Sequence, residues 1–176
     1  MIRALRYSWV LAGLALGSSF VLGDEGKNFL RNAGFEQGGA GQVADWQVAP
    51  SWQGSLETAT GAGVSHGGKS CATLSAVTKN GKAWGRVFQP VRPPAITARR
   101  FRFSVWAKGQ GECLLGLIQY RPPQAGQVHY VYAWQEKPTP LTDTWQELSQ
   151  ELQVLDPQVQ SFGAAIAVRG DGSRAP

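Results

Sequence analysis

The sequence is poor in the residues that build metal and redox centres. It contains two cysteines and two histidines among 176 residues, and neither a Cys-x-x-Cys pair nor a histidine-rich cluster occurs. Zinc coordination needs several such ligands at short spacings, so a zinc site is not expected. Long periodic apolar stretches are also scarce, which argues against a helical bundle and for short strands joined by turns.

The one long uncharged stretch lies near the N-terminus. Arg3 and Arg6 precede an apolar run from Trp9 to Leu22, which ends in small residues before Asp24. This pattern predicts a secretory signal peptide over residues 1–23, removed after Gly23. The competing interpretation is a single membrane anchor, but glycines and serines interrupt the run, which is shorter than the roughly 20 apolar residues of a span.

The predicted mature chain, residues 24–176, has the length of one domain. We expect it to be secreted or located in the cell envelope, with no membrane attachment once the signal peptide is gone. The net charge of +5 loses two positive charges with Arg3 and Arg6, and most of the remaining basic residues are scattered. Nucleic acid is therefore not expected as a partner. In an oxidising compartment Cys71 and Cys113 either form one disulfide or are small buried residues on separate strands.

Glycine, proline and alternating apolar residues predict an all-β fold, specifically an antiparallel β-sandwich. Alternation is clearest over residues 101–108, where Phe101, Phe103, Val105 and Ala107 share one face. Further strands are expected near residues 71–77, 84–91, 113–120 and 128–135, separated by turn-forming Gly and Pro clusters.

Two later segments need separate treatment. Residues 161–168 alternate between Phe162, Ala164, Ile166 and Val168 on one face and small residues on the other, so both faces are expected to be covered. Residues 142–155 fit a short amphipathic helix as well as a strand. We favour the strand for two reasons. Leu148, Gln150, Leu152 and Val154 are also spaced with the period of a strand, and the segments on both sides are expected to be strands.

Several motifs, taken in order, resemble those of a known group of domains. They are Asn28-Phe29-Leu30-Arg31-Asn32-Ala33-Gly34-Phe35-Glu36, Trp46, His66-Gly67-Gly68-Lys69-Ser70, Trp84-Gly85-Arg86-Val87-Phe88-Gln89-Pro90-Val91, the strand from Phe101, Thr144-Trp145-Gln146-Glu147 and the strand ending at Gly170. Together they resemble carbohydrate-binding modules of families 4, 9, 16 and 22, which are galactose-binding-like jelly rolls.

The resemblance implies a jelly-roll β-sandwich and a structural calcium ion near the first strand. Glu36 is the residue expected to contribute to that site, because calcium prefers oxygen ligands. Modules of this kind normally close with one more strand, which carries acidic residues and would follow residues 171–176. We therefore expect residues 24–176 to be a C-terminally incomplete module.

Stacking on a sugar ring requires outward-facing aromatic side chains with polar groups beside them. Alternation within the predicted strands singles out eight residues for this role: Trp84, Arg86, Phe88, Trp106, Gln119, Tyr130, Tyr132 and Trp134. Tyr120 is the alternative to Gln119 beside the stripe from Tyr130 to Trp134. The alternative is that these aromatic stripes are core. Trp46, Trp52 and Trp145 are expected to be packed structural residues or loop aromatics.

No catalytic residue is predicted. Gly63-Val64-Ser65-His66-Gly67 matches the nucleophile-elbow pattern, but no helix is expected after it. The acidic residues form no pair in an aromatic setting that would suit a glycosidase. We therefore expect a non-enzymatic module that binds a poly- or oligosaccharide, as an accessory to a glycoside hydrolase system or as part of a longer chain with a catalytic domain.

Two other functions stay open at this point. One is an extracellular or cell-envelope module that contacts protein or serves a structural role, with its aromatics buried. The other is a small β-sandwich hydrolase or lyase, which would need a cleft with convergent carboxylates or a Tyr/His/Arg set.

Overall fold

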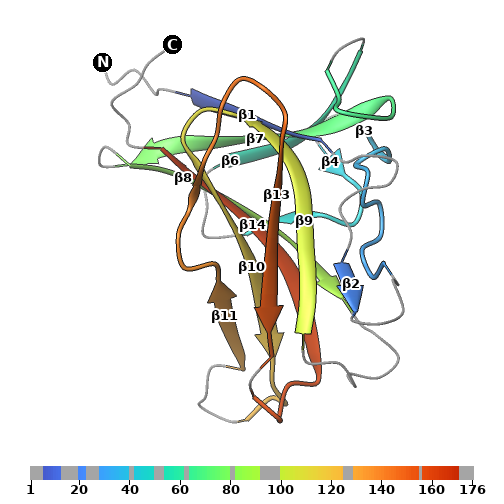
Figure 1. Cartoon of the computed structure of the whole chain (residues 1–176), viewed down its shortest axis with the longest axis vertical. Helices are drawn as coiled ribbons and strands as arrows, with labels where there is room; N and C mark the ends of the chain where they lie inside the picture. Colours follow the sequence, from blue (N-terminus) through green and yellow to red (C-terminus); the bar gives the residue numbers. More distant parts are fainter. Residues whose placement is uncertain are drawn as a thin grey trace.

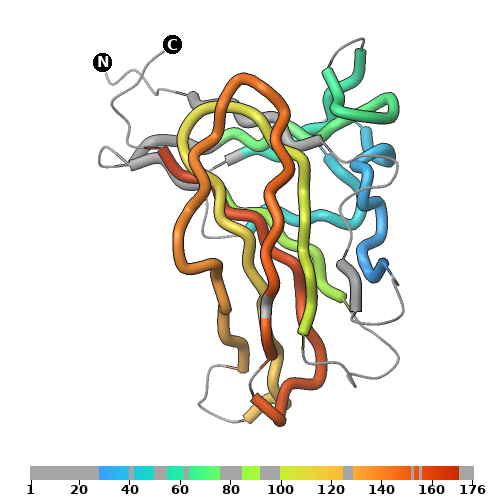
Figure 2. Tube along the Cα trace, in the orientation of Figure 1, coloured from blue at the N-terminus to red at the C-terminus, as the bar shows by residue number. Residues whose placement is uncertain are grey.

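The computed structural model describes most of the chain. The described ranges are residues 6–12, 20–22, 28–39, 42–49, 54–61, 64–79, 82–91, 100–124, 129–154 and 156–170 (Figure 1). At residues 6–12, 20–22, 54, 76–79, 82–84 and 152 the backbone alone is described, and these positions are grey in Figure 2. Within these ranges every regular element is a strand (Figure 1). No helix there is long and apolar enough to cross a bilayer.

The strands vary from two to ten residues in length. They are β1 (Arg6–Ala12), β2 (Phe20–Leu22), β3 (Gly38–Gly39), β4 (Gln42–Val43), β5 (Gln47–Val48), β6 (Gly54–Thr60), β7 (Ser70–Lys79), β8 (Lys82–Val91), β9 (Arg100–Gly109), β10 (Glu112–Tyr120), β11 (Tyr130–Trp134), β12 (Thr139–Pro140), β13 (Gln146–Gln153) and β14 (Ser161–Gly170). The five strands expected near residues 71–77, 84–91, 101–108, 113–120 and 128–135 are all confirmed.

All strands but β3 and β4, which form a separate two-stranded sheet, make up two antiparallel layers that pack face to face. The first layer has the order β11-β10-β14-β8, with β5 beside β8 and β12 beside β10. The second has the order β6-β7-β1-β9-β13, with β2 also beside β9. The short pairing of β7 with β8 joins the layers. The antiparallel jelly-roll-type β-sandwich expected from the sequence is therefore confirmed.

The core lies between the layers and follows the alternation in the sequence. Phe101, Phe103 and Val105 of β9 are buried against Phe162 and Ile166 of β14. The rings of Phe101 and Phe162 have centroids 4.3 Å apart. Apolar burial of this kind contributes roughly 25 cal/mol per Å², which makes this contact between the layers a main source of stability.

Residues 142–155, which fitted either a helix or a strand, contain a strand, and residues 161–168 are a strand as expected. Residues 146–153 form β13, which pairs with β9 so that Leu148 lies opposite Val105 and is buried. β14 is buried on both faces from Phe162 to Val168, as its small and large alternating residues predicted.

Two strands belong to the segment predicted to be a signal peptide. β1 pairs with both β7 and β9, and β2 pairs with β9. The chain before processing thus places residues 6–12 within the second layer. Removal after Gly23 stays a prediction, as does the missing last strand, since residues 171–176 lie outside the described part.

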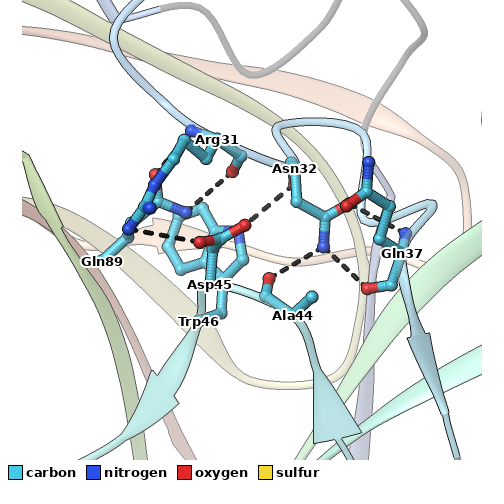
Figure 3. Close-up of polar contacts among 7 residues, drawn as sticks. All are labelled: Arg31, Asn32, Gln37, Ala44, Asp45, Trp46 and Gln89. Carbon is cyan, nitrogen blue, oxygen red and sulfur yellow. Dashed lines mark hydrogen bonds and ion pairs between the residues drawn. The ribbon is translucent and has the colours of Figure 1, made fainter.

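The segment that carries the Asn28–Glu36 motif is held in place by polar contacts around Asn32 (Figure 3). Asn32 adopts a left-handed backbone conformation with φ of 44°, which asparagine tolerates better than most residues. Its amide nitrogen donates to the carbonyls of Gln37 and Ala44, both at 2.8 Å, and its amide oxygen accepts from the Gln37 N–H at 2.9 Å. One side chain thereby bridges both ends of the loop, which the Ala44 N–H also closes by donating to the Gln37 carbonyl at 2.9 Å.

Gln89 connects this loop to the first layer by hydrogen bonds. It lies on the inward side of β8 and is completely buried. Its amide donates to the Arg31 carbonyl at 2.8 Å and accepts from the Arg31 N–H at 2.7 Å, and Arg31 also pairs with Asp45 at 3.2 Å. A buried amide is tolerated here because both of its ends are hydrogen-bonded.

The two cysteines are not joined. Cys71 of β7 and Cys113 of β10 are both free and buried. Burial raises the pKa of the Cys113 thiol to about 12, so it stays protonated at neutral pH. Of the two alternatives that the sequence left open, the structure has the small buried residues on separate strands.

Replacing Gln89 by leucine should destabilise the fold without changing its core volume much. Q89L leaves the N–H and C=O of Arg31 without their partners, and each unsatisfied group costs about 1–3 kcal/mol. We expect the free energy of unfolding, measured by urea titration, to fall by about 2–4 kcal/mol. The matched change at the exposed Gln158 should shift it by less than about 0.5 kcal/mol. Equal effects at both positions would contradict the role of Gln89.

Candidate functional site

The outward face of the first layer is defined by the pairing register. Residues directly opposite each other in antiparallel strands share a face. Trp134, Gly116, Ala165 and Phe88 therefore form one row across β11, β10, β14 and β8. A second row runs through Tyr132, Ile118, Gly163 and Pro90. Leu115 and Leu117 of β10 and Phe162 and Ile166 of β14 point the other way, into the core.

Small residues occupy the middle of this face. β14 contributes Gly163, Ala165 and Ala167 to it, and β10 contributes Gly116. The benzene ring of Trp134 lies over Gly116, because a Cβ atom at that glycine would come within 2.3 Å of Trp134 Cε3. A side chain at position 116 would exclude the ring from this place, so the glycine is what allows Trp134 to lie on the sheet.

The aromatic residues of β11 form a continuous strip, which we define as Tyr130, Tyr132 and Trp134. The rings of Tyr132 and Trp134 are stacked, with centroids 5.6 Å apart and an interplanar angle of 10°. Tyr130 meets Tyr132 edge-on at 5.6 Å and is 41% exposed, whereas the other two rings are half-buried. The strip therefore combines fixed rings with surface that solvent can reach.

Arg86 reaches this strip from β8. Its guanidinium carbon lies 4.6 Å from the centre of the Tyr132 ring, a cation–π contact that orients both side chains. Tyr120 lies opposite Tyr130 in the same face. Burial raises the pKa of the Tyr120 hydroxyl; Tyr132 adds to the rise and Arg86 opposes it. The strip is therefore bordered by a guanidinium and by the Tyr120 hydroxyl, which stays protonated at neutral pH.

Five of the eight residues predicted for ligand binding come together here: Arg86, Phe88, Tyr130, Tyr132 and Trp134. The backbone of Trp84 pairs with Arg169 at one end of the same layer, but its side chain is outside the described part. Gly116 was missed, and Tyr120 was predicted only as the alternative to Gln119. The alternation of both residues with Cys113, Leu115 and Leu117 was the signal that could have identified them.

Two predicted residues lie elsewhere. Gln119 is opposite Val131 and Phe162 on the core side of β10 and is 7% exposed, so Tyr120 takes the position beside the strip. Trp106 is on β9, in the second layer. It does lie off the core stripe of that strand, as expected, but it is not next to the other seven.

Trp106 belongs to a separate aromatic cluster. Its ring stacks on His66 with centroids 3.7 Å apart, and His66 meets Trp145 edge-on at 6.0 Å. The ammonium of Lys108 lies 4.7 Å from the centre of the Trp145 ring. All four side chains are half-buried. Trp145 thus packs in a loop contact, as predicted, and Trp46 is in the core; Trp52 lies outside the described residues.

Glu36 has a structural role in the described fold. Both of its carboxylate oxygens accept the Lys69 N–H, at 3.1 and 3.2 Å, and Oε1 packs against Gly68. Among the described residues no group of three His, Cys, Asp or Glu side chains is placed to hold a metal. Calcium takes six to eight oxygens, so these residues do not by themselves make such a site, and calcium at Glu36 stays a prediction.

Ser65 and three of the acidic residues of the described part have structural hydrogen bonds or ion pairs. Ser65 donates to the Gly68 carbonyl at 3.1 Å, in a loop that leads directly into β7 rather than into a helix. This is not the geometry of a nucleophile elbow. The carboxylates of Asp45, Glu112 and Asp156 are each paired with an arginine.

The fold and this face define an antiparallel β-sandwich with an aromatic strip on one sheet. No protein-family model matches the chain, and no curated protein matches it. Among solved structures, the enzymatically active domain of tailspike protein 4 of bacteriophage CBA120 is similar, with a TM-score of 0.51 and 15% identity over 80% of this chain. The match spans 19% of the tailspike chain, about a fifth of its length, and the likeness is one of fold alone.

Two smaller domains are similar over nearly their whole length. A family 61 carbohydrate-binding module in complex with β-1,4-galactotriose has a TM-score of 0.48 and 17% identity, over 82% of this chain and 88% of that one. The CBM22-1 xylan-binding domain of Paenibacillus barcinonensis Xyn10C has a TM-score of 0.49 and 16% identity, over 89% of this chain and 92% of that one.

Substituting Gly116 by alanine should displace the Trp134 ring. The added Cβ would lie 2.3 Å from Cε3, so the indole must move and its stack with Tyr132 must break. We expect a weaker near-ultraviolet circular dichroism signal and a loss of about 1–3 kcal/mol in unfolding free energy, as in other overpacked sites. Gly39→Ala is the control, because a Cβ there meets nothing within 4 Å. An unchanged spectrum in G116A would contradict this packing.

Proposed function

We propose that this chain binds polysaccharide on the outward face of its first layer. The observation that carries the proposal is the pair of parallel rings of Tyr132 and Trp134, held on the sheet above Gly116. A sugar ring presents an apolar C–H face edged by hydroxyls, and fixed aromatic rings with polar groups around them match that surface.

The strip suits an extended glycan better than a single sugar. Tyr130, Tyr132 and Trp134 follow one another along one face of β11, so stacked sugar units would lie along the strand. The Arg86 guanidinium and the hydroxyls of Tyr130 and Tyr120 border the rings and can hydrogen-bond to sugar hydroxyls. Because the rings are already packed, little side-chain entropy is lost on binding.

We infer a non-catalytic, accessory role for this binding outside the cytoplasm. The strip presents aromatic rings, with the Arg86 guanidinium and the Tyr120 hydroxyl at its border, and these groups can bind sugars. Most glycoside hydrolases use a carboxylate pair, and none of the residues that form or border the strip is acidic. Such a module keeps an attached enzyme or cell surface close to the polysaccharide that it binds. It thereby raises the local concentration of substrate and catalyses no reaction itself.

The test is a titration with soluble glycans. Intrinsic tryptophan fluorescence of the chain is followed with β-1,4-galactan oligosaccharides, xylan oligosaccharides, mixed-linkage β-glucan and mannan. We expect saturable quenching by at least one glycan. Trp134→Ala should weaken it at least about tenfold, a loss of roughly 1.4 kcal/mol of binding free energy, because the stacking surface is gone.

Trp106→Ala is the matched control, since it removes the same side chain from the other layer. It should change the dissociation constant by less than about twofold. If Trp106→Ala rather than Trp134→Ala abolishes binding, the glycan site is at the Trp106 cluster and the proposal fails. If the folded chain responds to no glycan, the module has a different ligand, with protein the first alternative.

A further inference from the structure

Cleavage after Gly23 would remove a strand from the middle of the second layer. β1 lies between β7 and β9, with six residue pairs to β7 and four to β9. β2 pairs with the remaining stretch of β9, from Phe101 to Phe103. Both strands lie within residues 1–23, which are predicted to be removed, so the same cut would expose one edge of β7 and one edge of β9.

These two edges cannot close on each other by hydrogen bonding in place. Both strands are antiparallel to β1, so they run in the same direction, and β1 holds them two strand spacings apart, roughly 9.6 Å. The N–H and C=O groups that β1 satisfies would face each other across a gap one strand wide. Unpaired backbone groups in the middle of a sheet are costly, and such an edge readily accepts another strand.

The emptied position has a defined chemistry. On its inner side it is lined by side chains that are completely buried: Ala72 and Leu74 of β7, and Val105 and Ala107 of β9. A residue placed opposite Ala72 and Ala107 would point into the core. The next position on the outer side lies beside Thr73 and Lys108, which are half-buried. An extended segment with alternating apolar residues therefore fits.

We propose that the position between β7 and β9 is an acceptor site for a β-strand of another polypeptide, occupied before processing by residues 6–12 and afterwards by an extended, alternately apolar segment of a partner. Strand addition of this kind uses backbone hydrogen bonds for affinity and alternate side chains for specificity. The proposal rests on the predicted removal of residues 1–23 and is independent of glycan binding, which concerns the opposite layer.

The occupant is a different polypeptide rather than a second processed copy. The strand that fits the position lies in the removed segment, so a processed copy no longer carries it. The described strands from β3 to β14 are all paired within their own chain, which leaves none of them free to donate.

The test starts from the whole chain, folded with a specific protease site in place of residues 24–27 and then cut. The probe is a fluorescent peptide of residues 5–13, and the control is the same peptide with Val10→Pro, which removes one backbone N–H. We expect the native peptide to bind saturably and to slow amide exchange of residues 72–77 and 106–109 at least about tenfold. The proline peptide should bind at least tenfold more weakly.

Three results would overturn the proposal. One is equal binding of the two peptides. Another is a dimer of the cut protein whose β7 and β9 amides are already protected, which would mean that a second copy fills the position. The third is a monomer with the same protection, which would mean that the sheet has closed.

The uncut chain provides a test that does not depend on the stability of the cut protein. Val10→Pro in the whole chain should speed amide exchange in residues 72–77 and 106–109 while β10 and β14 stay protected. No change in exchange there would also overturn the proposal.

Discussion

The central strand β14 sets the character of both faces of the first layer. Its inward residues Phe162, Ile166 and Val168 fill the core, whereas its outward residues are glycine and alanine. If those outward residues were large, they would fill the middle of the face and keep aromatic side chains from lying across it. Because they are small, Trp134 can lie over Gly116 and Arg86 can extend as far as Tyr132. Packing in the core and shape on the surface thus follow from one alternating segment.

The loop that carries the Asn28–Glu36 motif is tied to the same layer by a different kind of interaction. Gln89 places an amide at a core position, where it makes two hydrogen bonds to the Arg31 backbone. Asn32 connects the two ends of the loop through its own side-chain amide. Glu36 extends this arrangement to the turn before β7 through the Lys69 N–H. Polar residues in the motif are therefore explained by backbone contacts, which do not depend on any ligand.

Much of the fold follows from alternation in the sequence, and the limits of that approach are equally physical. Period-two patterns identified β7 to β11, β13 and β14, but not β1 to β6 or β12, and they predicted that both faces of residues 161–168 are covered. Alternation also identified Arg86, Tyr132 and Trp134 as outward-facing. It could not show that Trp106 lies in the other layer, since the order of strands depends on pairings between residues far apart in the chain. Gln119 was predicted on the outward face because its side chain is polar. It shares a face of β10 with Cys113, Leu115 and Leu117, and that face lies on the core side.

In the proposed function, the strip on β11 and Arg86 bind the glycan. Chemical-shift mapping by NMR with the soluble glycan panel is the sharpest test, because it locates the contact without altering a residue. We expect shift changes to concentrate at Tyr120, Tyr130 to Trp134, Arg86 and Phe88. Changes concentrated at Trp106 and His66 instead, or no change with any glycan, would contradict the proposed function.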